Sequence, residues 1–166
     1  MNYEEKKQRF VQTWGALGSS WGISKTMAQI HALLLISPES LSAEDIMEEL
    51  SISRGNVNMN VRGLIEWGLV EKDLKLGERK EFFKADKDVE RFARAIARER
   101  LKKEIEPVQK ILSELNDNNG DSPEEKEMEN VVGDIADFTN KVYSIMDKFV
   151  RSDEHWLYKN ALKLLK

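Results

Sequence analysis

The side chains with the clearest chemical potential lie on one predicted helix, Ser53 to Trp67. At about 100° per residue, the face opposite its apolar stripe carries amides, an arginine, a methionine and glycines. That face comprises Gly55, Asn56, Met59, Arg62 and Gly63, flanked by Asn58 and Asn60. An asparagine amide can form two hydrogen bonds with an adenine edge, an arginine can do the same with a guanine edge, and a methionine tip can lie on a thymine methyl.

The composition of this face departs from that of an ordinary solvated helix. Asparagine and glycine are poor helix formers, and a surface helix normally carries Glu, Lys, Gln and Ala instead. From Leu50 to Ile65 the sequence also contains no acidic residue. One interpretation is a merely irregular helix. We favour the interpretation that poor helix formers occupy this face because they contact DNA bases.

The neighbouring segments predict how this helix is positioned. Ser42 is the expected N-cap of a short preceding helix, with Asp45 completing a variant of the capping box, and Ser53 is the expected N-cap of the second helix. Two β-like runs follow, Leu69 to Leu74 and Arg79 to Phe83, joined by residues 75–78. Helix, tight turn, helix and hairpin is the pattern of a winged helix-turn-helix, so the predicted fold is mainly α with a small β-hairpin wing.

This stretch resembles the DNA-binding region of MarR-type winged-helix regulators. The residues that carry the resemblance are LSAEDIMEELSISRGNVNMNVRGLIEWGLVEK followed by GERKEFFKA, and they are most similar to the GbsR-like branch. The resemblance extends back through Trp14 to Ile36 and, more weakly, into the C-terminal helices. It implies a dimeric transcriptional regulator, often a repressor, in a branch where some members respond to choline or related osmolyte precursors.

The residues expected to contact double-stranded DNA come from the helix and the wing. They are Ser53, Arg54, Asn56, Asn58, Met59, Arg62, Lys75, Arg79 and Lys80. Ser53 is expected to cap the helix and also to place its hydroxyl near a phosphate. Arg79 sits where the wing arginine of related regulators enters the minor groove, and narrow minor grooves attract arginine. The alternative for Arg79 is a surface ion pair with Glu78 or Glu81, which would contribute little.

Charge is the main objection to DNA binding. The 166-residue chain has a net charge of −4, whereas a basic domain is the usual footprint of a DNA-binding protein. The acidic residues are concentrated between Asp117 and Asp137, where Lys126 is the single basic residue. Screening over about 10 Å at ordinary salt means that a distant acidic patch does not cancel a local basic one.

Other function classes find little support. The chain has no cysteine and only two histidines, His31 and His155, which argues against thiol chemistry and a histidine metal site. We find no nucleophile elbow, P-loop or dinucleotide fingerprint, so we expect neither an enzyme nor a cofactor. A winged helix that binds a protein partner instead of DNA is the alternative. No signal peptide or membrane span is visible, so we expect a soluble cytoplasmic protein without membrane contact.

The flanking segments are predicted to be helical. We expect helices over Tyr3–Trp14 and Ser24–Ile36, with a bend at Gly15, Gly18 and Gly22 between them, and a long helix from Asp86 or Asp88 with a kink at Pro107. A loop over residues 116–123 precedes a helix capped by Ser122, and a last helix is expected from about Asp153. The predicted parts are an N-terminal helix (1–22), the winged helix (23–85) and a helical dimerisation region (86–166).

The long apolar stripes after residue 86 find few partners within one chain. An unpartnered stripe usually marks an oligomer interface, so we expect a homodimer that reads two half-sites. The alternative is a self-contained helical bundle.

Three aromatic residues, Phe10, Trp14 and Trp21, allow two interpretations. They could form part of a cage for a quaternary ammonium effector, held by cation–π attraction. Aromatic residues at helical spacing are more often packing in a core, and that is the alternative. His31 is expected at a helix surface or core edge and not as a ligand.

Overall fold

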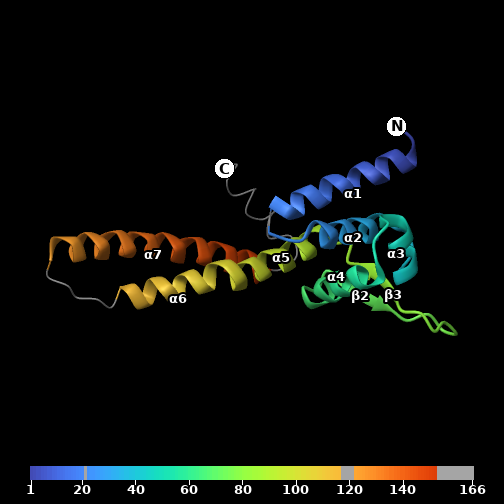
Figure 1. Ribbon diagram of the computed structural model, residues 1–166. Coiled ribbons are helices and arrows are strands. Elements are labelled where there is room, and N and C mark those ends of the chain that lie inside the picture. The colour runs from blue at the N-terminus through green and yellow to red at the C-terminus, as the bar shows by residue number, and fades with distance from the viewer. Residues whose placement is uncertain (21, 117–121, 153–166) are drawn as a thin grey trace, which may run out of the picture. The chain divides into compact units, whose positions relative to one another are not determined.

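The computed structural model describes residues 1–20, 22–116 and 122–152 (Figure 1). They form a mainly helical protein with one small antiparallel sheet, which confirms the predicted winged helix-turn-helix class. The chain divides into two compact units, Met1–Phe92 and Ala93–Lys166. The elements in order are α1 (Tyr3–Ser20), α2 (Lys25–Ile36), β1 (Leu41–Ser42), α3 (Ala43–Leu50), α4 (Arg54–Glu66), β2 (Val70–Asp73), β3 (Phe82–Ala85), α5 (Val89–Arg100), a π-helical turn (Leu101–Ile105), α6 (Glu106–Leu115) and α7 (Pro123–Val150).

Serine side chains start helices α2, α3 and α4, as the sequence predicts. The Ser24 hydroxyl accepts a hydrogen bond from a backbone N–H in the first turn of α2. Ser42 and Asp45 form a reciprocal capping box on α3, and Ser53 caps α4. The backbone N–H of Ser42, followed by its hydroxyl, lowers the pKa of Asp45. Each such cap typically stabilises a helix by about 1 kcal/mol, so these serines fix where the helices begin.

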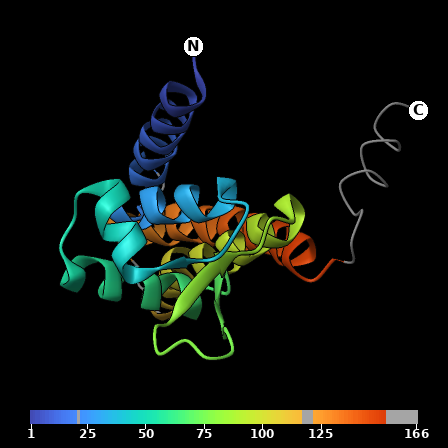
Figure 2. The same ribbon diagram turned by 90° about the vertical axis from the view of Figure 1, so that its right-hand side faces the viewer.

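The sheet differs from the expected two-strand hairpin. Its order is β1–β3–β2, and the two-residue strand β1 pairs with Phe82 and Phe83. The predicted strand ends are also wrong, because pairing between β2 and β3 stops at Asp73 and Phe82. Residues 74–81 form a longer loop, which extends beyond the sheet (Figure 1, Figure 2). Leu74 and Leu76 are almost fully exposed there. They therefore have no apolar neighbours whose burial would favour continued strand pairing.

The core of the first unit lies between the helices and the sheet. Its largest fully buried side chains are Ile30, Leu33, Leu34, Ile46, Val57, Val61, Leu64 and Leu69. Helices α3 and α4 each bury one face here, α2 is buried over most of its circumference, and Phe83 contributes from β3. This shared core therefore sets the position of α4.

The N-terminal helix continues past the predicted bend. α1 runs to Ser20 through both Gly15 and Gly18, and these glycines lie against α2. A β-carbon at Gly18 would lie 2.4 Å from the β-carbon of Ala28, and one at Gly15 would lie 2.7 Å from a side-chain carbon of Gln29. The glycines thus allow close helix packing, and only Gly22, at φ +77°, serves the turn.

His31 lies deeper than expected. It is only 2% exposed, because it packs between α1 and the start of α5 within the first unit. Its ring lies edge-on to Phe92, with centroids 5.5 Å apart, and 6.2 Å from the centroid of Trp14. Burial lowers its pKa to about 4. Its Nε2 has no hydrogen-bond partner among the described residues.

The second unit is built on a helical hairpin. α6 and α7 run side by side in opposite directions (Figure 1). The kink expected at Pro107 takes the form of the π-helical turn just before α6, which places the proline in the first turn of α6, where its missing N–H costs little. Ser122 and Glu125 form the predicted capping box of α7. The helix expected from Asp153 lies outside the described residues.

Among the described residues, no helix is long and apolar enough to span a membrane.

The buried imidazole predicts a pH-dependent stability. The folded-state pKa of His31, about 4, lies below its ordinary value of 6.5, so the unfolded chain binds the proton more readily. The free energy of unfolding should therefore decrease as the pH falls from 6.5 towards 4, by up to about 3 kcal/mol for this group. Urea denaturation across this range measures the decrease. The H31L variant removes the titrating group, and equal pH dependence in H31L and the wild type would contradict the prediction.

Candidate nucleic-acid interface

Helix α4 is held in place by one apolar stripe and one buried amide. Val57, Val61 and Leu64 are almost inaccessible to solvent, as predicted. Asn60 is also buried, which corrects its expected place beside the outward face. Its Oδ1 accepts a hydrogen bond of 2.9 Å from the Ser24 hydroxyl, and its Nδ2 donates one of 2.8 Å to the backbone carbonyl of Asn56. Both hydrogen bonds satisfy a polar group that would otherwise be costly to bury.

Gly63 is also less exposed than predicted. A β-carbon at Gly63 would lie 3.3 Å from the terminal methyl of Met27, so this glycine allows close packing of α2 on α4. The exposed face of α4 is therefore narrower than the sequence suggested.

The remaining outward residues of α4 form a compact polar face. We call this the reading face, and it consists of Asn56, Asn58, Met59 and Arg62. All four are exposed, and the Met59 side chain is 65% exposed although it is apolar. A tight turn after α3 orients the helix, because Ser51 adopts a left-handed conformation and the Ile52 N–H donates to the Met47 carbonyl.

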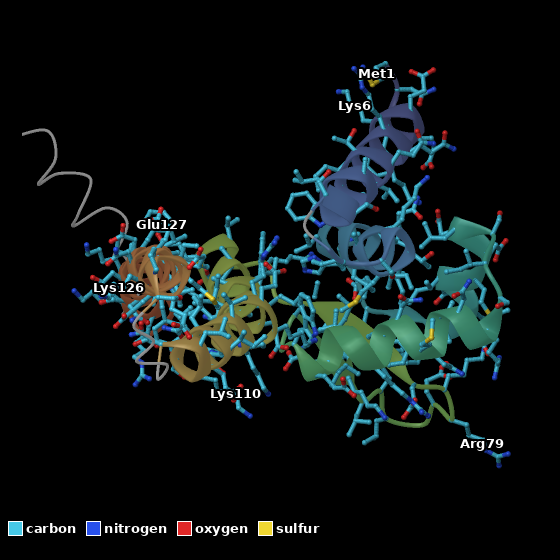
Figure 3. All side chains as sticks on the ribbon, turned by 60° about the vertical axis from the view of Figure 1, so that its left-hand side comes forward. Met1, Lys6, Arg79, Lys110, Lys126 and Glu127 are labelled. Carbon is cyan, nitrogen blue, oxygen red and sulfur yellow. The ribbon has the colours of Figure 1, made fainter. Side chains whose placement is uncertain are left out.

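The wing loop, residues 74–81, brings further cationic groups to the same unit. The Lys75 ammonium lies 4.2 Å from the centroid of the Phe82 ring, a cation–π contact that holds its stem at the base of the loop. Arg79 points outward at the far end of the loop (Figure 3). Lys80 lies close enough to α3 for its charge to contribute to the lowered pKa of Glu44. The largest cause of that lowering is a hydrogen bond from the backbone N–H of Glu44 itself, and Arg54 also contributes.

The cations near α4 and the wing fall into two groups. Arg54 is paired with Glu44, Lys72 with Glu81, and Lys84 with Glu71 at 3.2 Å. Lys75 has the cation–π contact with Phe82 and no ion pair among the described residues, and Arg62, Arg79 and Lys80 have neither. Of the two acidic partners considered for Arg79, Glu81 is paired with Lys72, and Glu78 forms no ion pair among the described residues. The three unpaired cations are therefore available to an external anion.

The nine DNA-contact residues expected from the sequence all lie at the surface of the first unit. Ser53 is partly committed, because its hydroxyl accepts a hydrogen bond of 3.3 Å from the Asn56 N–H. The sequence did not reveal the role of Glu44, which neutralises Arg54 from the preceding helix. Two residues ten positions apart on different helices leave no periodic signal.

The aromatic residues form a packed group in the same unit. Phe10 stacks on Trp14, with ring centroids 5.6 Å apart, and Trp14 lies edge-on to Phe92 at 6.1 Å. Phe10 remains 36% exposed. The third expected cage residue, Trp21, lies outside the described residues. Within the described part of the chain, no group of three or more His, Cys, Asp or Glu residues could hold a metal ion.

Comparisons with known proteins agree with this geometry. Residues 17–79 match the model of the MarR family. The chain is 28% identical over 85 residues to the HTH-type transcriptional regulator MmpR5 of Mycobacterium tuberculosis (strain ATCC 25618 / H37Rv), an alignment that covers 51% of this chain and 52% of that relative. The chain thus spans about half the length of this curated relative.

A solved structure shares the fold over most of the chain. It is described as a crystal structure of a transcriptional regulator, with a TM-score of 0.54 and 20% sequence identity, covering 86% of this chain and 99% of the other. Residues 17–79, which include most of the winged helix, are thus similar to the MarR family.

Proposed function

We propose that this protein is a sequence-specific double-stranded DNA-binding regulator that acts as a homodimer. α4 would enter the major groove, and residues 75–80 of the wing loop would lie on the backbone or in the minor groove. The observation that carries the proposal is the juxtaposition of a reading face without acidic residues and three cations that have no partner among the described residues. Phosphate contacts position such a protein, and base contacts give it specificity.

Each group has a distinct proposed role. Asn56 and Asn58 offer amides for base edges, and Met59 offers an apolar tip for a thymine methyl. Arg62, Lys75 and Lys80 are assigned to phosphates, and Arg79 to the minor groove. Arg54 and Ser53, at the start of the helix, are proposed to lie near the backbone. There Arg54 would exchange its ion pair with Glu44 for a phosphate.

The net charge of −4 is compatible with this function because charge is distributed unevenly. The acidic residues of α7 belong to the second unit, whereas the unpaired cations belong to the first. The proposal therefore predicts modest non-specific affinity and a clear dependence on the bases. A winged helix that binds protein would not require amides on its exposed face, so we rank that alternative second.

The finer expectations stay predictions. These are membership of the GbsR-like branch, action as a repressor in the cytoplasm, and the division into residues 1–22, 23–85 and 86–166.

The proposed effector is a quaternary ammonium compound bound against Phe10 and Trp14. The exposed edge of Phe10 and the stacking of the two rings support this hypothesis, although Trp14 also packs on Phe92. Choline titrated to millimolar concentration should quench tryptophan fluorescence saturably, and W14F should lose that change. Bound choline should also change the affinity of the protein for DNA, by the same factor by which bound DNA changes its affinity for choline. A constant spectrum would assign these rings to packing alone.

Substitutions on the reading face should weaken discrimination between DNA sequences. N56A, N58A or M59A should reduce the preference for the specific duplex over a scrambled one by about 1–3 kcal/mol wherever the residue makes a good base contact. The specific duplex is first selected from a random library with the wild-type protein, and binding is then titrated on both duplexes. A wild-type protein without any sequence preference, or three variants with unchanged preference, would overturn the proposal.

Substitutions of the unpaired cations should act on all sequences alike. R62A and K80A should each weaken binding to specific and scrambled duplexes equally, and should reduce the slope of log affinity against log salt by about 0.9 per lost phosphate contact. R79A should instead affect A·T-rich sites with a narrow minor groove most strongly. K110A, which removes one exposed lysine from α6, serves as the matched control and should leave the slope unchanged. A slope equally insensitive to all four changes would contradict the assigned contacts.

A further inference from the structure

Helix α7 carries an apolar stripe that the described residues leave largely exposed. We call it the outer stripe, and its members are Met128, Val131, Ile135, Phe138, Val142 and Ile145. They recur at alternating spacings of three and four residues, which is the heptad pattern of a coiled-coil seam. Phe138 is 68% exposed and Ile145 64% exposed, and Val142 is half-buried. Large apolar side chains repeated in this way mark a contact surface.

A second heptad stripe on α7 already has a partner. Val132, Ala136, Thr139, Tyr143 and Val150 are buried or half-buried, and this inner stripe faces α6 and the π-helical turn before it. The two stripes lie about 100° apart on the helix because each outer residue is next to an inner one in sequence. α7 is therefore built to pack against two neighbouring helices, of which α6 is one.

The hairpin has one polar side and one apolar side. On the polar side, the Gln109 Nε2 donates to the Asn140 Oδ1 at 2.7 Å across a groove between α6 and α7. At about 100° per residue, the exposed residues Val108, Ile111 and Leu115 lie on the other side of α6, next to the outer stripe. The apolar side thus continues from α7 onto α6.

The charges that border the outer stripe identify its partner. One heptad position is held by Met128, Ile135 and Val142 and, one heptad further on, by Phe149. The residues just before these four are Glu127, Asp134, Lys141 and Lys148, so one edge of the stripe is acidic in its first half and basic in its second. Glu127 projects outward from α7 (Figure 3). None of these four side chains forms an ion pair among the described residues. Such an edge is complementary to itself when it is reversed end to end.

We propose that the outer stripe pairs with the α7 helix of a second copy of this chain, in an antiparallel arrangement around a twofold axis near Asp137. In this register Ile135 packs against Phe138 of the partner subunit, and Met128 against the partner's Ile145. Asp134 then faces the partner's Lys141, and Glu127 faces the partner's Lys148. The twofold axis repeats every contact, so each dimer holds two copies of both ion pairs.

A second copy fits better than an unrelated protein because the pattern is its own complement. A parallel pairing would place identical charges at the same height along the two helices. The opposite edge of the stripe, which these charges would then face, consists of Val132, Thr139 and Met146 and carries no charge. The inference rests on the homodimer proposed above and assigns one of its interfaces. It does not depend on whether that dimer binds DNA.

Engineered cysteines test the orientation directly, since the chain has no cysteine of its own. Positions 134 and 141 of one helix are about 10 Å apart along its axis, too far for a disulfide within the chain. The D134C/K141C variant should therefore form a covalent dimer under mild oxidation, whereas D134C alone and K141C alone should not. K126C, on the same helix but outside the stripe, is the control. Efficient cross-linking of D134C alone, or none in D134C/K141C, would overturn the proposal.

Charge reversal tests the same register through its effect on the equilibrium between monomer and dimer. K141E replaces both Asp134–Lys141 pairs by repulsions and should raise the dimer dissociation constant about tenfold. D134K/K141E exchanges the two charges and should return it to within about threefold of the wild type, while K126E should leave it unchanged. Sedimentation equilibrium measures all four proteins. A wild-type protein that is monomeric at micromolar concentration would refute the pairing, and so would a double variant whose dimer is no tighter than that of K141E.

Duplex titrations on the same samples separate the two proposals. A protein that dimerises in the antiparallel register but shows no duplex preference overturns the proposed function and leaves this interface in place. A sequence-specific protein whose cysteine variants fail to cross-link does the reverse.

Discussion

The position of α4 depends on one buried strip that combines apolar contact with a single amide. Val57, Val61 and Leu64 supply the burial, and burying three such side chains is worth several kcal/mol, at about 1.5–3 kcal/mol each. Apolar contact alone lets a helix slide or rotate. The hydrogen bond from the Ser24 hydroxyl to Asn60 restricts both motions, because it joins the N-cap of α2 to the middle of α4. The direction of the reading face follows from that fixed orientation.

This anchoring explains why α4 can carry residues that favour helices poorly. Asparagine and glycine each cost several tenths of a kcal/mol to about 1 kcal/mol relative to alanine. The Ser53 cap and the buried stripe offset that cost, so the outward positions are free to serve contact with a ligand. Gly63 meets a packing requirement instead, since Met27 occupies the space beside it.

Local patterns made most of the fold predictable, and long-range contacts account for what was missed. The N-caps at Ser24, Ser42, Ser53 and Ser122 depend on residues within one turn, so the sequence revealed them. Strand β1 has only two residues and exists because β3 lies beside it. The sequence predicts a bend at Gly18 because the residue that packs against it, Ala28, belongs to another helix and leaves no local signal. The nine candidate DNA-contact residues lie at the surface, whereas the burial of Asn60 and His31 depends on residues of other helices that pack on them.

The surface ion pairs, more than the number of cations, determine which positive charges are available to a phosphate. Counting lysines and arginines gives a basic wing, yet Lys72 and Lys84 face glutamates on the neighbouring strand, and Arg54 faces Glu44. Such exposed pairs add little stability, but they hold a side chain in place and cancel its charge locally. The field that a DNA phosphate would meet therefore comes mainly from Arg62, Lys75, Arg79 and Lys80. Because these four lie on α4 and on the wing loop, the structure concentrates positive charge at the two elements that a winged helix presents to DNA.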